Sequence, residues 1–141
     1  MRYVLGSSVA FKWEVREADT DAALRLRDET RAGLHALLAP DVFPVEVIHA
    51  LTRAERQGRL TPAEGARAMT AVPTELPALH PSLPLLPRAY ALSSATRQGV
   101  YDCLYVALAE REECELVTAD DRLAKNLRPQ FPFTTLLASL P

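Results

Sequence analysis

Cysteine and histidine are both scarce in this chain of 141 residues. The two cysteines, Cys103 and Cys114, form neither a C-x-x-C pair nor a disulfide framework, so we expect a reducing, cytoplasmic setting and buried thiols. The three histidines do not have the spacing of zinc ligands, and we expect no zinc site. No apolar run approaches the roughly 18 residues of a membrane span, and the first residues do not resemble a secretory signal. We therefore expect no membrane partner.

A strong net charge is also missing. The chain has 16 basic and 18 acidic residues, which leaves a net charge of −2. A protein that wraps duplex nucleic acid carries a global basic field, so any nucleic-acid contact must come from a local patch. The scarcity of glycine (5 residues) beside 48% apolar residues favours a helix-rich chain with a sizeable core. The length suits one domain over residues 1–141.

Short apolar segments alternate with segments of helical periodicity. We expect strands at Tyr3–Leu5, Leu76–Leu79, Glu115–Thr118 and Phe133–Leu137. We expect a helical turn at Val9–Trp13 and helices from Asp19 or Thr20 to Leu37, at Val45–Gln57, from Thr61 to Pro73, at Arg88–Arg97, at Tyr101–Glu113 and from Asp120 or Asp121 to Asn126. This alternation predicts an α/β fold with a parallel sheet and helices on both faces. In such folds ligands bind beyond the carboxyl ends of the strands.

Three carboxylates, Glu46, Asp102 and Asp120, stand at the starts of elements that should border one end of the sheet. Each has a purely structural interpretation, because an acid in a first helical turn caps free N–H groups and meets the positive end of the helix dipole. Glu46 could equally face water beside His49 and Arg53. As a group, however, clustered carboxylates raise one another's pKa values. A hard divalent cation, Mg²⁺ or Mn²⁺, would remove that conflict.

Four blocks of the chain resemble the motifs of the PIN-domain family. They are most similar to the VapC-type toxins of toxin–antitoxin operons, and they lie at Tyr3–Ala10, Pro44–Val47, Tyr101–Ala109 and Leu116–Asp120. The resemblance covers nearly the whole chain in the order of the family. It implies a three-layer α/β/α sandwich with a central parallel sheet. It also implies a Mg²⁺- or Mn²⁺-dependent ribonuclease for single-stranded or looped RNA, which forms a homodimer and is held inactive by a cognate antitoxin.

The resemblance also implies roles for individual side chains. Glu46, Asp102 and Asp120 would be the catalytic, metal-binding acids. Asp121 is a further candidate ligand, with a helix cap as its alternative role. Thr118 would hold the last acidic loop by hydrogen bonding, with Ser7 as another supporting residue.

The chain departs from the family at position 6, where an Asp normally ends the first strand and Gly6 stands here. A missing ligand misplaces the activated water, and we expect impaired activity. Three explanations are open: an inactivating substitution, a decayed toxin that still binds antitoxin, or replacement of the ligand by Ser7, Ser8 or water. The alternative function is a catalytically inactive PIN-fold module that dimerises and binds an antitoxin or RNA.

An RNA substrate would need basic side chains near the acids. Lys12, Arg97 and Arg122 lie in or near the motif blocks and are candidates for phosphate contacts. For each of them, ordinary solvated charge is the alternative interpretation. We expect Tyr101 and Tyr105, in the third motif block, to be packing residues.

Overall fold

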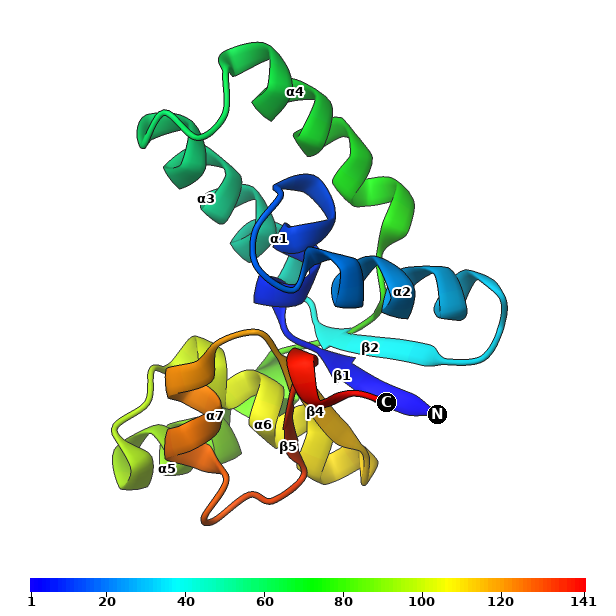
Figure 1. The fold of residues 1–141 in the computed structure, drawn as a ribbon. Coiled ribbons are helices and arrows are strands. Elements are labelled where there is room, and N and C mark those ends of the chain that lie inside the picture. Colours follow the sequence, from blue (N-terminus) through cyan, green and yellow to red (C-terminus); the bar gives the residue numbers. More distant parts are fainter.

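A five-stranded parallel sheet forms the centre of the computed structural model, which describes residues 1–141 (Figure 1). Each neighbouring pair of strands is parallel, and the spatial order is β3-β2-β1-β4-β5. The chain leaves β1 towards β2 and later crosses back to β4, so a topological switch point lies between the carboxyl ends of β1 and β4. The strands are β1 (Arg2–Leu5), β2 (Ala36–Pro40), β3 (Ala78–His80), β4 (Glu115–Thr118) and β5 (Thr134–Leu136).

The two strands beside the switch point are apolar on both faces. Val4 and Leu5 in β1 and Leu116 and Val117 in β4 are almost fully buried. Continuous apolar runs of this kind are typical of parallel strands that helices cover on both sides. The strands predicted at these two positions are confirmed.

Seven α-helices cover the sheet. They are α1 (Ser7–Glu14), α2 (Thr20–Arg31), α3 (Phe43–Arg56), α4 (Pro62–Ala71), α5 (Leu86–Thr96), α6 (Val100–Glu112) and α7 (Asp121–Leu127), and turns of 3₁₀ helix lie at Val72–Glu75, Leu83–Leu85 and Leu137–Ser139. Helices α1 to α4 lie on one side of the sheet and α5 to α7 on the other (Figure 1). The expected three-layer α/β/α fold is therefore confirmed. None of the helices has the length and apolar character needed to cross a lipid bilayer.

Helix α6 lies in the core and positions one of the predicted site acids. The seven consecutive residues from Cys103 to Ala109 are buried, because one side of the helix packs on β1, β2 and β4 while α5 covers the other side. A helix that is apolar all round is stabilised by such enclosure. The first turn of α6, which contains Asp102, is held beside the switch point by this packing.

The prediction of one helix from Asp19 or Thr20 to Leu37 is wrong. Helix α2 ends at Arg31, and Gly33 follows it with φ +82°, a conformation that ends helices and favours glycine. The chain then enters β2, where Leu37 pairs with Tyr3 of β1. The apolar residues before and after the turn are spaced by three and four residues, so the pattern predicted one continuous helix where the structure has a helix and a buried strand.

Two further strands and the remaining helices match the predictions with shifted ends. The strand expected at Leu76–Leu79 is Ala78–His80, and the one expected at Phe133–Leu137 is Thr134–Leu136. The turn expected at Val9–Trp13 is the longer helix α1. The cap predicted at Thr61 is confirmed, since its side chain accepts a hydrogen bond from the backbone N–H of Glu64, and the Glu64 side chain accepts one from the backbone N–H of Thr61.

Candidate functional site

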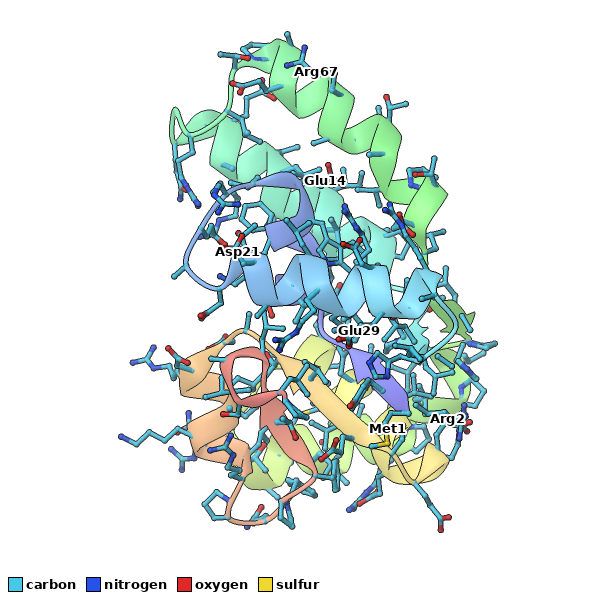
Figure 2. All side chains as sticks on the ribbon, turned by 45° about the vertical axis from the view of Figure 1, so that its right-hand side comes forward. Met1, Arg2, Glu14, Asp21, Glu29 and Arg67 are labelled. Atoms are coloured by element: carbon cyan, nitrogen blue, oxygen red, sulfur yellow. The ribbon has the colours of Figure 1, made fainter.

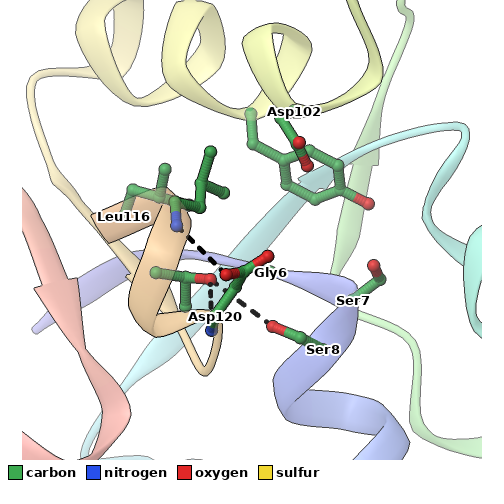
Figure 3. Close-up of a pocket in the computed structure, with 9 residues that line it drawn as sticks. Gly6, Ser7, Ser8, Asp102, Leu116 and Asp120 are labelled. Carbon is green, nitrogen blue, oxygen red and sulfur yellow. Dashed lines mark hydrogen bonds between the residues drawn. The ribbon is translucent and has the colours of Figure 1, made fainter. Parts of the chain in front are cut away.

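A polar pocket of about 150 Å³ opens at the switch point (Figure 3). Its walls come from the start of α1, the first two turns of α6, and β4 with the loop that leads to α7. The nine lining residues are Gly6, Ser7, Ser8, Asp102, Tyr105, Leu116, Thr118, Asp120 and Leu123. The fold therefore brings two of the three predicted acids into one pocket at the place where ligands bind in doubly wound sheets.

The loop that carries Asp120 is braced by short hydrogen bonds (Figure 3). The backbone N–H of Asp120 donates to Thr118 Oγ1 at 3.1 Å, and the backbone N–H of Ala119 donates to Ser8 Oγ at 3.0 Å. Asp120 Oδ1 in turn accepts from the backbone N–H of Leu123 at 3.0 Å and so caps α7. One carboxylate oxygen is engaged by the cap, which leaves the other for a ligand.

Ser8 braces this loop, whereas the Ser7 side chain lies near the hydroxyl of Tyr105. Ser8 Oγ lies 3.5 Å from Thr118 Oγ1 in addition to its bond with the loop. Ser7 lines both the acidic pocket and the neighbouring hollow over α3. The two adjacent serines therefore have different surroundings, which no sequence pattern distinguished.

Glu46 approaches the acidic pocket from α3 and is held by Tyr105 of α6. The Tyr105 hydroxyl donates to Glu46 Oε1 at 2.6 Å. Burial raises the pKa of the Glu46 carboxyl, the hydrogen bond from Tyr105 opposes that rise, and the charge of Asp102 adds to it. Burial also raises the pKa of the Tyr105 phenol, and the charge of Glu46 acts in the same direction. The hydroxyl therefore keeps its proton and remains a donor.

Asp102 connects the three acids electrostatically. Burial raises the pKa of its carboxyl above the ordinary value, and the charge of Asp120 contributes to the rise. Asp102 in turn raises the pKa of Glu46. Carboxylates that disfavour one another's ionisation are a common feature of functional sites, although structural networks also produce such shifts. The arrangement favours a bound cation.

The donors around the pocket fit a hard divalent cation. Asp102 and Asp120 offer carboxylate oxygens, and the hydroxyls of Ser7 and Ser8 lie on the wall formed by α1. No three Asp, Glu, His or Cys side chains converge closely enough to form a complete metal cage. Mg²⁺ is commonly held by one or two carboxylates together with waters and substrate phosphates. The donor set therefore suits an ion whose coordination is completed by water and substrate.

Gly6 ends β1 at the rim of this pocket. Its backbone N–H donates to the carbonyl oxygen of Val117 at 2.8 Å. A Cβ atom added at Gly6 would lie 3.0 Å from that same oxygen and 3.6 Å from Ser8 Oγ. An Asp at this position would thus require a shift of a few tenths of an ångström between β1 and the Val117 carbonyl of β4, whereas its contact with Ser8 would be an ordinary one.

The remaining predicted site residues lie outside the acidic pocket. Asp121 lines a separate hollow together with Lys125 and Arg128. Lys12 is engaged locally, because its ammonium group donates to Glu17 Oε1 at 3.3 Å and its side chain is only 11% exposed.

Arg97 and Arg122 are exposed and also lie outside the acidic pocket. Arg97 follows the end of α5 with φ +61°. Arg122 lies in the first turn of α7. Neither side chain lines the acidic pocket.

Sequence reasoning missed the part of two tyrosines beside the acids. Tyr105 is predicted to be a packing residue, yet it holds Glu46. Tyr101 is predicted to be a packing residue too, but it is exposed and lines the hollow next to Glu46. His49 and Arg53 line the same hollow, in agreement with the helix face that the sequence predicts they share with Glu46.

Comparison with known proteins agrees with this geometry. A family model described as the PIN domain matches residues 3–127. The chain therefore belongs to the PIN-domain family, and its curated relatives place it among the VapC-type members.

Two relatives illustrate the similarity. VapC ribonuclease Mb0985 of Mycobacterium bovis is 33% identical over 100 residues, which are 71% of this chain and 77% of that protein. Ribonuclease VapC3 of Mycobacterium tuberculosis is 34% identical over 122 residues, which are 86% of this chain and 85% of that protein. The similarity thus extends over most of both chains.

Solved structures show the same fold. PAE2754 from Pyrobaculum aerophilum superimposes with a TM-score of 0.68 and 21% identity over 99% of this chain and 94% of that one. VapBC2 from Rickettsia felis, solved bound to a DNA fragment from its promoter, superimposes with a TM-score of 0.65 and 15% identity over 96% of this chain and 97% of that one.

Proposed function

We propose that this chain is a divalent-metal-dependent endoribonuclease of the toxin type whose activity is impaired by Gly6. The observation that carries the proposal is the pairing of Asp102 and Asp120 in one pocket at the switch point, with Glu46 electrostatically coupled to Asp102. The curated relatives are named ribonucleases, which supports the reaction class. We propose that residues 1–141 act as one PIN domain in the cytoplasm.

The side chains have distinct parts in this proposal. Asp102 and Asp120 would hold Mg²⁺ or Mn²⁺, which when bound activates water and neutralises charge on a phosphodiester. Glu46, oriented by Tyr105, would accept a hydrogen bond or proton at the edge of the pocket. Thr118 and Ser8 keep the Asp120 loop in place. Asp121, in its separate hollow, lies in the first turn of α7, which Asp120 caps, and would interact with the positive end of the helix dipole.

The absent side chain at Gly6 supports a second candidate function. Without that ligand the pocket presents two lining carboxylates and no complete metal cage. A catalytically inactive module that dimerises and binds an antitoxin would keep the fold and the pocket but cleave nothing. Both candidates include a homodimer and a cognate antitoxin as partners.

A Gly6→Asp variant separates the two functions. Mn²⁺ is titrated by calorimetry into the wild-type chain and the variant, and cleavage of a single-stranded RNA is followed in parallel. The double variant Gly6→Asp/Asp102→Asn is the matched control, because it restores the missing acid while it removes another. If the single variant binds the ion more tightly and cleaves RNA while the control does neither, the endoribonuclease proposal is supported. If no form binds or cleaves, the binding module replaces it.

Two further experiments test the proposed partners. Light scattering of the purified chain measures its mass, and a dimer is expected. Co-expression with a candidate antitoxin, taken from any small reading frame adjacent to the gene, tests the antitoxin partner. A stable complex that blocks cleavage by the Gly6→Asp variant is expected, and free cleavage in its presence would contradict the proposal.

A further inference from the structure

A hollow of about 510 Å³ lies beside the acidic pocket, between α3 and the start of α6. The two spaces adjoin at Ser7, which lines both of them. Glu46 lies at the end that adjoins the acids, and the hydroxyl of Tyr105 holds it there. The lining residues are Ser7, Val45, Glu46, His49, Ala50, Arg53 and Tyr101.

Two large apolar side chains in this hollow are exposed. The Tyr101 side chain is 62% exposed and that of Val45 is 70% exposed. Neither belongs to the core of the protein. An exposed aromatic ring in a groove next to a polar pocket can stack on a planar, apolar partner, and the bases of single-stranded nucleic acid are such partners.

The hollow also contains a permanent cation without an acidic partner. Arg53 makes no ion pair, whereas other arginines of the protein do, among them Arg2, Arg59 and Arg88. The guanidinium of an unpaired Arg is suited to a phosphate. Arg53 is seven residues from Glu46 on α3, which is about 10 Å along the helix axis. A phosphate at Arg53 is therefore separate from a phosphate at the acids.

We propose that this hollow binds a nucleotide of single-stranded RNA that flanks the cleaved phosphate, with its base on Tyr101 and a phosphate at Arg53. The inference rests on the proposed function and adds to it a separate subsite for a nucleotide beside the cleaved phosphate. Single-stranded RNA fits because its unstacked bases reach an aromatic side chain, whereas the bases of a duplex do not. The local cation also explains how a chain with a net charge of −2 holds a polyanion.

The test measures binding without cleavage. A short fluorescein-labelled single-stranded RNA is titrated in EDTA with the wild-type chain and with Tyr101→Ala, and fluorescence anisotropy gives each dissociation constant. Loss of one stacked base is expected to weaken binding about tenfold. Tyr101→Phe keeps the ring and should stay within about twofold of wild type. Tyr90→Ala is the matched control, because Tyr90 on α5 is 74% exposed and lies outside the hollow.

A second pair of variants tests the phosphate contact. Arg53→Ala should lower the slope of log affinity against log salt by about 0.7, the value for one phosphate of a single strand. Arg67→Ala is the control, since Arg67 lies on α4 at the end of the molecule remote from α6 (Figure 2). Thermal unfolding checks that all variants fold like the wild type.

The outcomes separate this inference from the function on which it rests. If wild type binds RNA but Tyr101→Ala and Arg53→Ala bind as tightly as their controls, the subsite is refuted while the ribonuclease proposal stands. Equal affinity for duplex and single-stranded RNA would also refute the subsite. If wild type binds no RNA in EDTA, the subsite is refuted, whereas the ribonuclease proposal is then decided by the cleavage assay of the Gly6→Asp variant with Mn²⁺.

Discussion

Replacing Tyr105 by phenylalanine removes one oxygen atom from the wall of the acidic pocket and keeps the ring that packs in the core. Tyr105 is only 4% exposed, and its hydroxyl donates the 2.6 Å bond to Glu46. This bond joins α6 to α3 across 59 positions of sequence. The variant removes this contact together with a weaker interaction of the hydroxyl with Ser7, and a double-mutant cycle separates the two.

The size of the effect follows from the charge of the acceptor. A hydrogen bond to a charged group contributes about 1.5–3 kcal/mol, so we expect Tyr105→Phe to lower the free energy of unfolding by about 2 kcal/mol near neutral pH. For a chain of this length that corresponds to a fall of about 6 °C in the melting temperature. The bond favours the ionised form of Glu46 and lowers its pKa. The loss should therefore shrink as the pH falls and Glu46 becomes protonated.

The assay is urea unfolding in EDTA near neutral pH and near about pH 4. A double-mutant cycle with Glu46→Ala isolates the pairwise energy, for which we expect at least about 1 kcal/mol of coupling. Tyr90→Phe is the control, since Tyr90 is exposed and its hydroxyl makes no hydrogen bond within the protein. Additive effects of Tyr105→Phe and Glu46→Ala would refute the argument. So would a Tyr105→Phe variant as stable as wild type near neutral pH.

Three further substitutions are expected to change stability in defined directions, each measured by urea unfolding. Gly6→Asp should lower the free energy of unfolding by about 1 kcal/mol in EDTA, because it adds a carboxylate beside Asp102 and brings a Cβ to 3.0 Å from the Val117 oxygen. Binding of Mn²⁺ should restore the stability. Asp102→Asn should raise the free energy of unfolding by about 1 kcal/mol near neutral pH. The folded protein raises the pKa of this carboxyl, so the wild type loses stability as the pH rises through the raised value, and the amide does not. A higher stability of the variant that persists near about pH 3 would contradict this cause. Thr118→Val should lower the free energy of unfolding by about 1 kcal/mol, since it removes the acceptor for the backbone N–H of Asp120. An unchanged urea midpoint would show that this hydrogen bond does not stabilise the loop.

Local patterns in the sequence were sufficient for much of the architecture. The apolar runs at Tyr3–Leu5 and Glu115–Thr118 are strands because parallel strands covered on both faces are continuously apolar. The cap at Thr61 formed because its side chain and that of Glu64 are close along one helix start. These features depend on residues a few positions apart. The order of the four family motifs also predicted which acids would lie at one end of the sheet.

The second strand shows where local patterns fail. Ala36–Pro40 is central in the sheet, but its apolar residues continue the helical spacing of the segment before it. The pairing of Leu37 with Tyr3 is a contact between distant residues, and burial between two neighbouring strands decides the conformation. In the sequence, the glycine at position 33 is the local sign that the helix ends there, and in the structure it adopts a positive φ.

The sequence by itself determined the fold class and the family, because both are expressed in short patterns and their order, and it singled out three acids as candidates. Only the tertiary structure decided which side chains surround those acids. It turned Tyr105 from a packing residue into the donor that holds Glu46, engaged Lys12 in a local ion pair, and opened a hollow that joins Arg53 to Tyr101. The physical reason is that the surroundings of a side chain are set by elements far away along the chain, which approach one another when the sheet and its helices pack.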